Sequence, residues 1–137
     1  MKGSQRLRVF LSHSDKNRAV AVTVHDYLTQ RGVEVWFSKK RIHAGSWLKE
    51  IGVALKRCNV FLVLLSPYSV KSRWVEREFD YALTHKQYDH HILIAELAKA
   101  DIEDLTWALS SQQIIVLHPG LEQRLPHLLR AVRKQAK

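Results

Sequence analysis

Two patterns of apolar residues alternate along the chain. In one, apolar residues follow each other in short runs, which is typical of strands buried in a sheet. In the other, they recur every three or four positions, which is typical of one face of a helix. The first pattern predicts strands over residues 7–11, 33–37, 59–65, 91–95 and 113–117. The second predicts helices whose apolar stripes include Val20, Val24 and Leu28; Trp47, Ile51 and Leu55; Val75, Phe79 and Ala82; and Leu121, Leu125 and Leu128. A short helical connection is expected over residues 102–109.

This alternation predicts the fold class. Strands that alternate with helices form parallel crossover units, so the expected class is α/β. Five strands in a chain of 137 residues favour a flavodoxin-like three-layer sandwich, which is a five-stranded parallel sheet of order 2-1-3-4-5 with helices on both faces. Such sheets bind ligands at the carboxyl ends of the strands, near the switch between the first and third strands. The loops over 12–15, 38–46 and 66–72 lie at that edge.

Polar residues before the predicted helices are their expected caps. Serine and aspartate accept hydrogen bonds from the free amides of a helix start. Candidate caps are Ser14 or Asp15 for the first helix, Ser46 for the second, and either Ser66, before Pro67, or Ser72 for the third. The loop over 38–46 is basic and long for a compact α/β domain, and long loops often carry function.

Glu78 has two interpretations on the third predicted helix. It lies at the edge of the apolar face formed by Val75, Phe79 and Ala82, and no lysine or arginine stands three or four residues away. The spacing alone favours a boundary glutamate that reaches solvent. The alternative is a carboxylate that is paired from another element or available for chemistry.

Composition indicates one globular domain over residues 1–137, with residues 1–6 expected to be flexible. The chain is 46% hydrophobic and 26% charged, which is ordinary for a soluble protein. Its single cysteine, Cys58, has no partner for an internal disulfide and is expected to be a small core residue. No apolar run approaches the roughly 20 residues of a membrane span, and the first residues lack the apolar centre of a signal peptide. We therefore expect a cytoplasmic protein without membrane partners.

The charge balance favours anionic partners. The chain has 22 Lys and Arg against 13 Asp and Glu, a net charge of +9. The excess is spread along the sequence, with small clusters over 39–41 and 130–137. Scattered charge is more often a solvated surface than a nucleic-acid site, and no zinc-finger spacing or RNA-binding signature accompanies it. We therefore do not expect nucleic acid as a partner of this domain.

Several uses of the flavodoxin-like architecture are excluded by missing residues. A phosphoacceptor receiver domain needs carboxylates after its first and third strands, where this chain has Ser12-His13-Ser14 and Ser66-Pro67. Neither a P-loop nor a Gly-x-Gly-x-x-Gly turn is present. Ser12-His13 is not a nucleophile elbow. His90 and His91 point to opposite sides of a strand, so no metal site is expected.

Four motifs, in order, resemble the Toll/interleukin-1 receptor (TIR) domain family over nearly the whole chain. They are Val9-Phe10-Leu11-Ser12-His13-Ser14 followed by Asn17, then Ile42-x-Ala44-Gly45-x-Trp47 as the BB loop, then Phe61-Leu62-Val63-Leu64-Leu65-Ser66-Pro67 as the third strand, and finally Trp74-x-x-x-Glu78. The last motif is similar to that of the NAD-cleaving branch of the family, found in bacterial, plant and axonal members. The chain departs from the family at Ser38, where many members have aspartate.

The resemblance implies an NAD+ glycohydrolase that cleaves the nicotinamide–ribose bond, with nicotinamide and ADP-ribose or a cyclic ADP-ribose isomer as products. It implies Glu78 as the catalytic carboxylate, NAD+ as the substrate, and neither cofactor nor metal. The expected substrate-binding residues are Phe10, Ser12, His13, Ser14, Asp15, Lys39, Lys40, Trp47 and Trp74. Each has a structural alternative: Phe10 and Trp47 as core residues, residues 12–15 as helix caps, Lys39 and Lys40 as solvated loop charges, and Trp74 as a support for Glu78.

The resemblance also implies self-assembly. Such domains act in homo-oligomers or filaments, where the BB loop of one copy docks on the next. The expected self-association residues are Arg41, Ile42, His43, Ala44, Gly45 and Ser46. A role in immune or antiviral defence or cell-death signalling is a further expectation. The alternative function is a non-enzymatic adaptor that acts by TIR–TIR interaction alone.

Overall fold

The computed structural model describes residues 6–37, 44–101 and 114–136, and of residues 44–48 the backbone alone. Its strands are β1 (Arg8–Ser12), β2 (Glu34–Trp36), β3 (Val60–Leu65), β4 (Ile92–Glu96) and β5 (Ile114–Val116). Its helices are α1 (Arg18–Gln30), α2 (Ala44–Arg57), α3 (Arg73–Thr84) and α4 (Leu121–Lys134). Three short 3-10 helices complete the described elements: η1 (Asp15–Asn17), η2 (Ser69–Lys71) and η3 (Lys86–Tyr88).

The strands form one parallel sheet of order β2-β1-β3-β4-β5, as predicted. Strand β1 lies between β2 and β3, so that Phe10 is in register with Trp36 on one side and Phe61 on the other. Strand β3 is buried along its whole length, which explains its uninterrupted apolar sequence. The flavodoxin-like fold is thereby confirmed.

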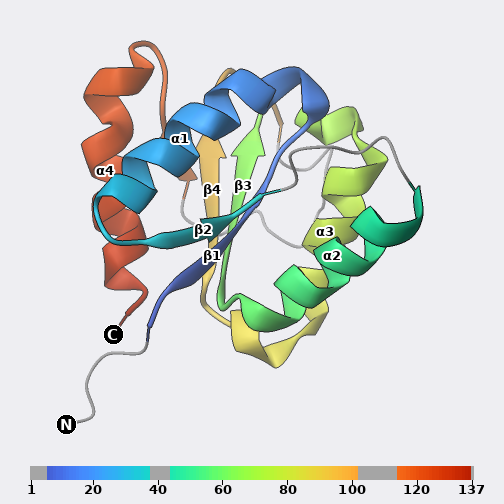
Figure 1. Ribbon diagram of the computed structural model, residues 1–137. Helices are drawn as coiled ribbons and strands as arrows, with labels where there is room; N and C mark the ends of the chain where they lie inside the picture. The colour runs from blue at the N-terminus through green and yellow to red at the C-terminus, as the bar shows by residue number, and fades with distance from the viewer. Residues whose placement is uncertain (1–5, 38–43, 102–113, 137) are drawn as a thin grey trace, which may run out of the picture.

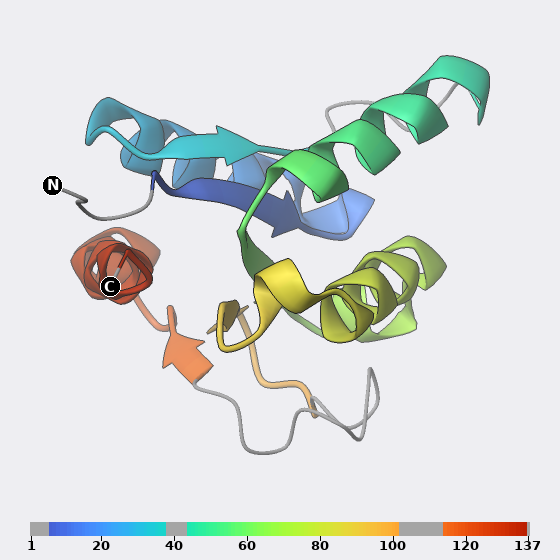
Figure 2. The ribbon, with the colours of Figure 1, turned by 90° about the horizontal axis from the view of Figure 1, so that it is seen from below.

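Helices cover both faces of the sheet. Figure 2 shows α1 and α4 on one side and α2 and α3 on the other. Side chains alternate along a strand, so each strand contributes to two separate cores. Val9 and Leu11 pack in the core under α1 and α4, whereas Phe10 packs in the core under α2 and α3. This alternation decides which residues at the strand ends face α3.

The helix starts correct two of the expected caps. Ser14 caps η1, where its side chain accepts a hydrogen bond from the amide of Lys16, and α1 begins only after Asn17. The prediction that Ser46 caps the second helix is wrong, because α2 begins at Ala44 and Ser46 lies inside it. Of the two alternatives for α3, Ser72 is the cap: its Oγ accepts from the amide of Val75 at 3.3 Å.

Two further expectations concern the connections. The helix predicted over 102–109 lies outside the described residues. None of the described helices is long and apolar enough to cross a membrane.

Candidate active site

Ser12 and Glu78 meet at the carboxyl edge of the sheet. Ser12 is the last residue of β1, and two-residue alternation directs it to the same face as Phe10, towards α3. On α3, Glu78 lies beside Phe79, which packs in that same core. The Oγ of Ser12 donates a hydrogen bond to Oε1 of Glu78 at 2.7 Å. Two residues that lie 66 positions apart in the sequence are therefore in direct contact.

Glu78 is buried, which overturns the expectation that it reaches solvent. Its exposed fraction is 2%, and that of Ser12 is 0%. Helix α3 packs closely enough on the sheet to carry Glu78 below the surface together with Val75 and Phe79. The burial of a carboxylate is costly unless hydrogen bonds compensate for the lost water. A hydrogen bond contributes about 0.5–1.5 kcal/mol, or about 1.5–3 kcal/mol where one partner is charged, so the Ser12 hydroxyl offsets part of that cost.

The residues that follow Ser12 form the first loop of this edge. His13 is fully buried, donates from Nδ1 to the Ser14 carbonyl at 2.8 Å, and lies edge-on to Phe37. Ser14 is also buried and caps η1. Asp15 is exposed and forms an ion pair with Arg18 at 3.6 Å. The structure thus places Ser12, His13 and Ser14 inside the edge and Asp15 on its surface.

A turn that contains Ser66 and Ser69 connects the loop after β3 to the loop after β1. The Oγ of Ser66 donates to Oδ1 of Asn17 at 2.7 Å and accepts from the amide of Ser69 at 3.1 Å. In return, the Oγ of Ser69 accepts from the amide of Ser66 at 2.8 Å. Asn17 is the asparagine of the first family motif, and its contact with Ser66 fixes η1 against η2. These contacts join the loop that follows β3 to the loop that follows Ser12.

The two described aromatic candidates differ in position. Phe10 has no exposed surface and stacks on Trp36 and Phe61, with ring centroids 5.1 and 5.8 Å apart. Phe10 is therefore a core residue, which was the alternative to a role in substrate binding. Trp74 is half-buried, and the guanidinium of Arg77 lies over its ring at 5.5 Å from the centroid. Trp74 therefore lies at the surface, one turn before Glu78 on α3.

The remaining candidates lie outside the described residues or have only a described backbone. Lys39, Lys40, Arg41, Ile42 and His43 fall in the first group, and Ala44, Gly45, Ser46 and Trp47 in the second. The last four form the first turn of α2. The described residues contain no group of three or more histidine, cysteine, aspartate or glutamate side chains placed to hold a metal ion.

The sequence analysis missed one polar pair at the same edge. His118, just after β5, donates from Nε2 to Oε2 of Glu96, the last residue of β4, at 2.6 Å. Both side chains are mostly buried. Adjacent parallel strands end side by side, so polar residues at the ends of β4 and β5 were the signal that could have indicated this contact.

Comparisons with known proteins identify a matching family model and similar sequences. A family model described as the TIR domain matches residues 9–129. Among relatives, the 2′ cyclic ADP-D-ribose synthase BtTIR of Bacteroides thetaiotaomicron is 28% identical over 87 residues, which cover 62% of this chain and 30% of the relative. The NAD(+) hydrolase TcpC of Escherichia coli is 30% identical over 88 residues, which cover 62% of this chain and 28% of the relative. The match thus spans less than a third of either relative.

A solved structure confirms the likeness of fold. The TIR domain of the Toll-related receptor TRR-2 from Hydra magnipapillata superposes with a TM-score of 0.72 at 16% identity, and the match covers 91% of this chain and 97% of that one. At this identity the similarity concerns the fold alone.

Proposed function

The chain belongs to the TIR domain family, and we propose that it is an enzyme that cleaves NAD+ at the nicotinamide–ribose bond, with Glu78 as the catalytic carboxylate. One observation carries the proposal: Glu78 is buried at the carboxyl edge of the sheet with a hydroxyl donor on its Oε1. Buried carboxylates are rare and costly, so they concentrate at functional sites. The relatives named as an NAD(+) hydrolase and a cyclic ADP-D-ribose synthase support this class of reaction.

The chemistry requires one carboxylate. The bond between the ribose C1′ and the pyridinium nitrogen breaks, and its electron pair leaves with nicotinamide, which departs neutral. Positive charge develops on the ribose, and an anionic Glu78 stabilises it electrostatically. Water then adds to C1′ and loses a proton, giving ADP-ribose; in a cyclase, a hydroxyl of the same nucleotide adds instead. Because the leaving group needs no proton, the second carboxylate of ordinary glycosidases is not required.

Ser12 supports Glu78 in this proposal. Its hydrogen bond fixes Oε1 and thereby orients the carboxylate before substrate arrives. Preorganised charge is effective because it costs no reorganisation during the reaction. Trp74 borders the substrate, and the basic residues Lys39 and Lys40 meet the pyrophosphate. These assignments follow the family resemblance.

The burial of Glu78 explains why activity should depend on assembly. At 2% exposure, the carboxylate can touch a ribose only after neighbouring atoms move. We propose that association with other TIR domains supplies that opening, through the BB-loop motif, whose residues from Ala44 onward begin α2 in this structure. Depletion of NAD+ on assembly would suit a switch in defence or cell-death signalling.

Nicotinamide release is the direct test. Concentrated protein is incubated with NAD+, free and immobilised on beads, and nicotinamide is quantified by chromatography. Glu78→Gln keeps the shape of the side chain and an acceptor for Ser12 but removes the charge, so release should fall by about 100-fold or more. Glu76→Gln is the matched control, because Glu76 is exposed on the same helix and should retain activity.

Two results would contradict the proposal. Undiminished release by Glu78→Gln would show that the carboxylate is not catalytic. The absence of release from folded wild-type protein under every assembly condition would favour the adaptor function instead.

A further inference from the structure

Basic residues that are scattered in the sequence converge on the edge of the sheet opposite to Glu78. In a parallel α/β fold, the amino ends of the strands and the carboxyl ends of the helices lie at one edge. In Figure 1, strands β3 and β4 point upward, so this edge is the lower one. We call it the amino-edge surface and define it by its basic members, which are Arg6, Arg8, Arg31, Lys56, Arg57, Lys86, Arg133 and Lys134. Among the described residues near the amino ends of the strands and the carboxyl ends of the helices, the acidic ones are Glu34 and Asp89.

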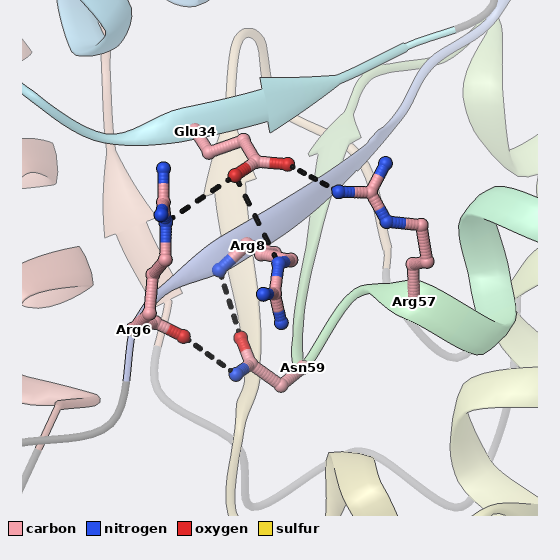
Figure 3. A network of polar contacts seen from close by, with 5 residues as sticks. All are labelled: Arg6, Arg8, Glu34, Arg57 and Asn59. Carbon is pink, nitrogen blue, oxygen red and sulfur yellow. Dashed lines mark hydrogen bonds and ion pairs between the residues drawn. The ribbon is translucent and has the colours of Figure 1, made fainter.

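Three arginines of this surface surround one carboxylate. Figure 3 shows the guanidinium groups of Arg6, Arg8 and Arg57 directed at Glu34, with ion-pair distances of 3.5, 3.8 and 3.3 Å. Asn59 accepts from the amide of Arg8 at 2.9 Å and donates to the carbonyl of Arg6 at 2.8 Å. One negative charge cannot balance three positive ones. The network therefore carries a net positive charge, and the hydrogen bonds of Asn59 hold the backbone of Arg6 and Arg8 in place. Arg6 and Arg57 remain largely exposed.

A second arginine pair extends the surface across α1 and α4. The guanidinium of Arg31 lies 3.7 Å from the centroid of the Tyr27 ring. Nη2 of Arg133 donates to the carbonyl of Arg31 at 3.4 Å. A hydrogen bond of 2.8 Å between His91 and Gln135 fixes the end of α4 beside the start of β4. The arginines of different elements are thus positioned by contacts that the sequence does not reveal.

Helix electrostatics explain only part of this charge. Cations near a helix carboxyl end interact favourably with its partial negative charge, and this accounts for Lys56 and Arg57 on α2 and for Arg133 and Lys134 on α4. It does not account for Arg6, which precedes a strand, or Arg8, which begins one. The accumulation around Glu34 therefore points to an external anion.

We propose that the amino-edge surface binds the phosphate backbone of nucleic acid without sequence selection. Arginine predominates among its members, and the planar guanidinium pairs with phosphate in a bidentate manner. Of the described residues, the large hydrophobics that are exposed are Val22, Val53, Tyr68, Ile114 and Val116, and of these only Ile114, the first residue of β5, lies at the amino end of a strand. Protein interfaces and membrane-bound helices need apolar anchors, so a polyphosphate fits this surface better than an acidic protein or a lipid bilayer.

The proposal is independent of NAD+ cleavage. The amino-edge surface and the Ser12–Glu78 pair lie at opposite ends of the strands, so a polymer bound to this surface does not cover the candidate active site. A polymer also binds several copies of the chain at once, which raises their local concentration. Nucleic acid bound in this way would be a scaffold rather than a substrate.

Fluorescence anisotropy with a labelled duplex of about 20 base pairs tests the proposal. Contacts with about four phosphates predict that affinity falls about 100-fold between roughly 50 and 200 mM salt. The double variant Arg6→Gln/Arg57→Gln should bind more than about tenfold more weakly at low salt. Its affinity should fall only about tenfold over the same range of salt. Lys16→Gln/Lys71→Gln is the matched control, because it removes the same charge from exposed residues at the opposite edge. Unfolding curves of both variants confirm that they are folded.

The outcomes separate the alternatives. Weak binding by the arginine variant together with near-normal binding by the lysine variant supports the proposal, and NAD+ cleavage by the arginine variant should be unchanged. Equal losses in both variants would attribute binding to net charge and overturn it. So would the absence of wild-type binding at micromolar protein, or equal binding of a poly-glutamate of matched charge, which would identify an acidic protein as the partner.

Discussion

Ser12→Ala tests the contact on which the candidate active site depends. The substitution removes the hydroxyl that donates to Oε1 of Glu78 at 2.7 Å and leaves the rest of β1 in place. Both residues are buried, so water does not readily replace the lost donor. The expected consequence is a less stable protein in which the Glu78 carboxylate is less firmly held.

The magnitude follows from the type of bond. A hydrogen bond to a charged group contributes about 1.5–3 kcal/mol, and we expect Ser12→Ala to lower the free energy of unfolding by that amount. For a domain of this size, about 1 kcal/mol corresponds to about 3–4 °C in Tm. The variant should therefore melt about 5–10 °C below the wild type. If Ser12 also orients the carboxylate for catalysis, kcat should fall about 10- to 100-fold with little change in KM.

A double-mutant cycle with Glu78→Gln isolates the interaction between the two side chains. Unfolding in urea, followed by tryptophan fluorescence, gives the free energies of the wild type, both single variants and the double variant. Glutamine still accepts from Ser12 but carries no charge, so Ser12→Ala should cost only about 0.5–1.5 kcal/mol in that background. The coupling energy should then be about 1 kcal/mol or more.

Additive effects would refute this reasoning. If Ser12→Ala costs the same with glutamate and with glutamine at position 78, the bond gains nothing from charge. An unchanged kcat in Ser12→Ala would further show that Ser12 has no role in positioning Glu78.

Two other predictions concern contacts elsewhere in the fold. Ser72→Ala removes the cap of α3 and should lower the free energy of unfolding by about 1 kcal/mol, whereas Ser72→Asp, which keeps an acceptor for the Val75 amide, should have little effect in the same urea experiment. Burial raises the pKa of the Cys58 thiol to about 11, so at pH 8 only about a thousandth of it is thiolate. A thiol-specific reagent should therefore label the folded protein at least about 100-fold more slowly than the protein in urea, and equal rates would contradict the burial.

The fold could be predicted from the sequence because its signals are local. Strand β3 reads as a continuous apolar run, and the amphipathic helices repeat at their own period. The site could be predicted only in part. The motif from Trp74 to Glu78 indicated the carboxylate that the structure buries at this edge, yet its burial depends on how closely α3 packs against the end of β1. Helical spacing reports neighbours on the same helix, so it could not show that Ser12 fills the space beside Glu78.

The same limitation explains why the sequence did not show that the basic residues gather at one edge. The basic residues appear scattered because Arg6, Arg31, Arg57 and Arg133 belong to different elements. Parallel topology brings the carboxyl ends of α1, α2 and α4 to one edge, where those residues meet. Arginines that recur near helix ends and strand starts in an alternating α/β sequence therefore predict a basic edge, although each local cluster is small.

Burial and charge together imply an order of events for the proposed enzyme. A carboxylate at 2% exposure is not accessible without movement of its neighbours, and in the proposed enzyme association would supply that movement before or while NAD+ binds. Binding free energies are reciprocal: if assembly opens the site for NAD+, then NAD+ must strengthen assembly by the same factor. A polymer on the amino-edge surface acts at the other end of the strands and contributes through local concentration alone. It would thus lower the amount of protein needed for assembly without altering the chemistry at Glu78, and the two edges of the sheet would act in sequence.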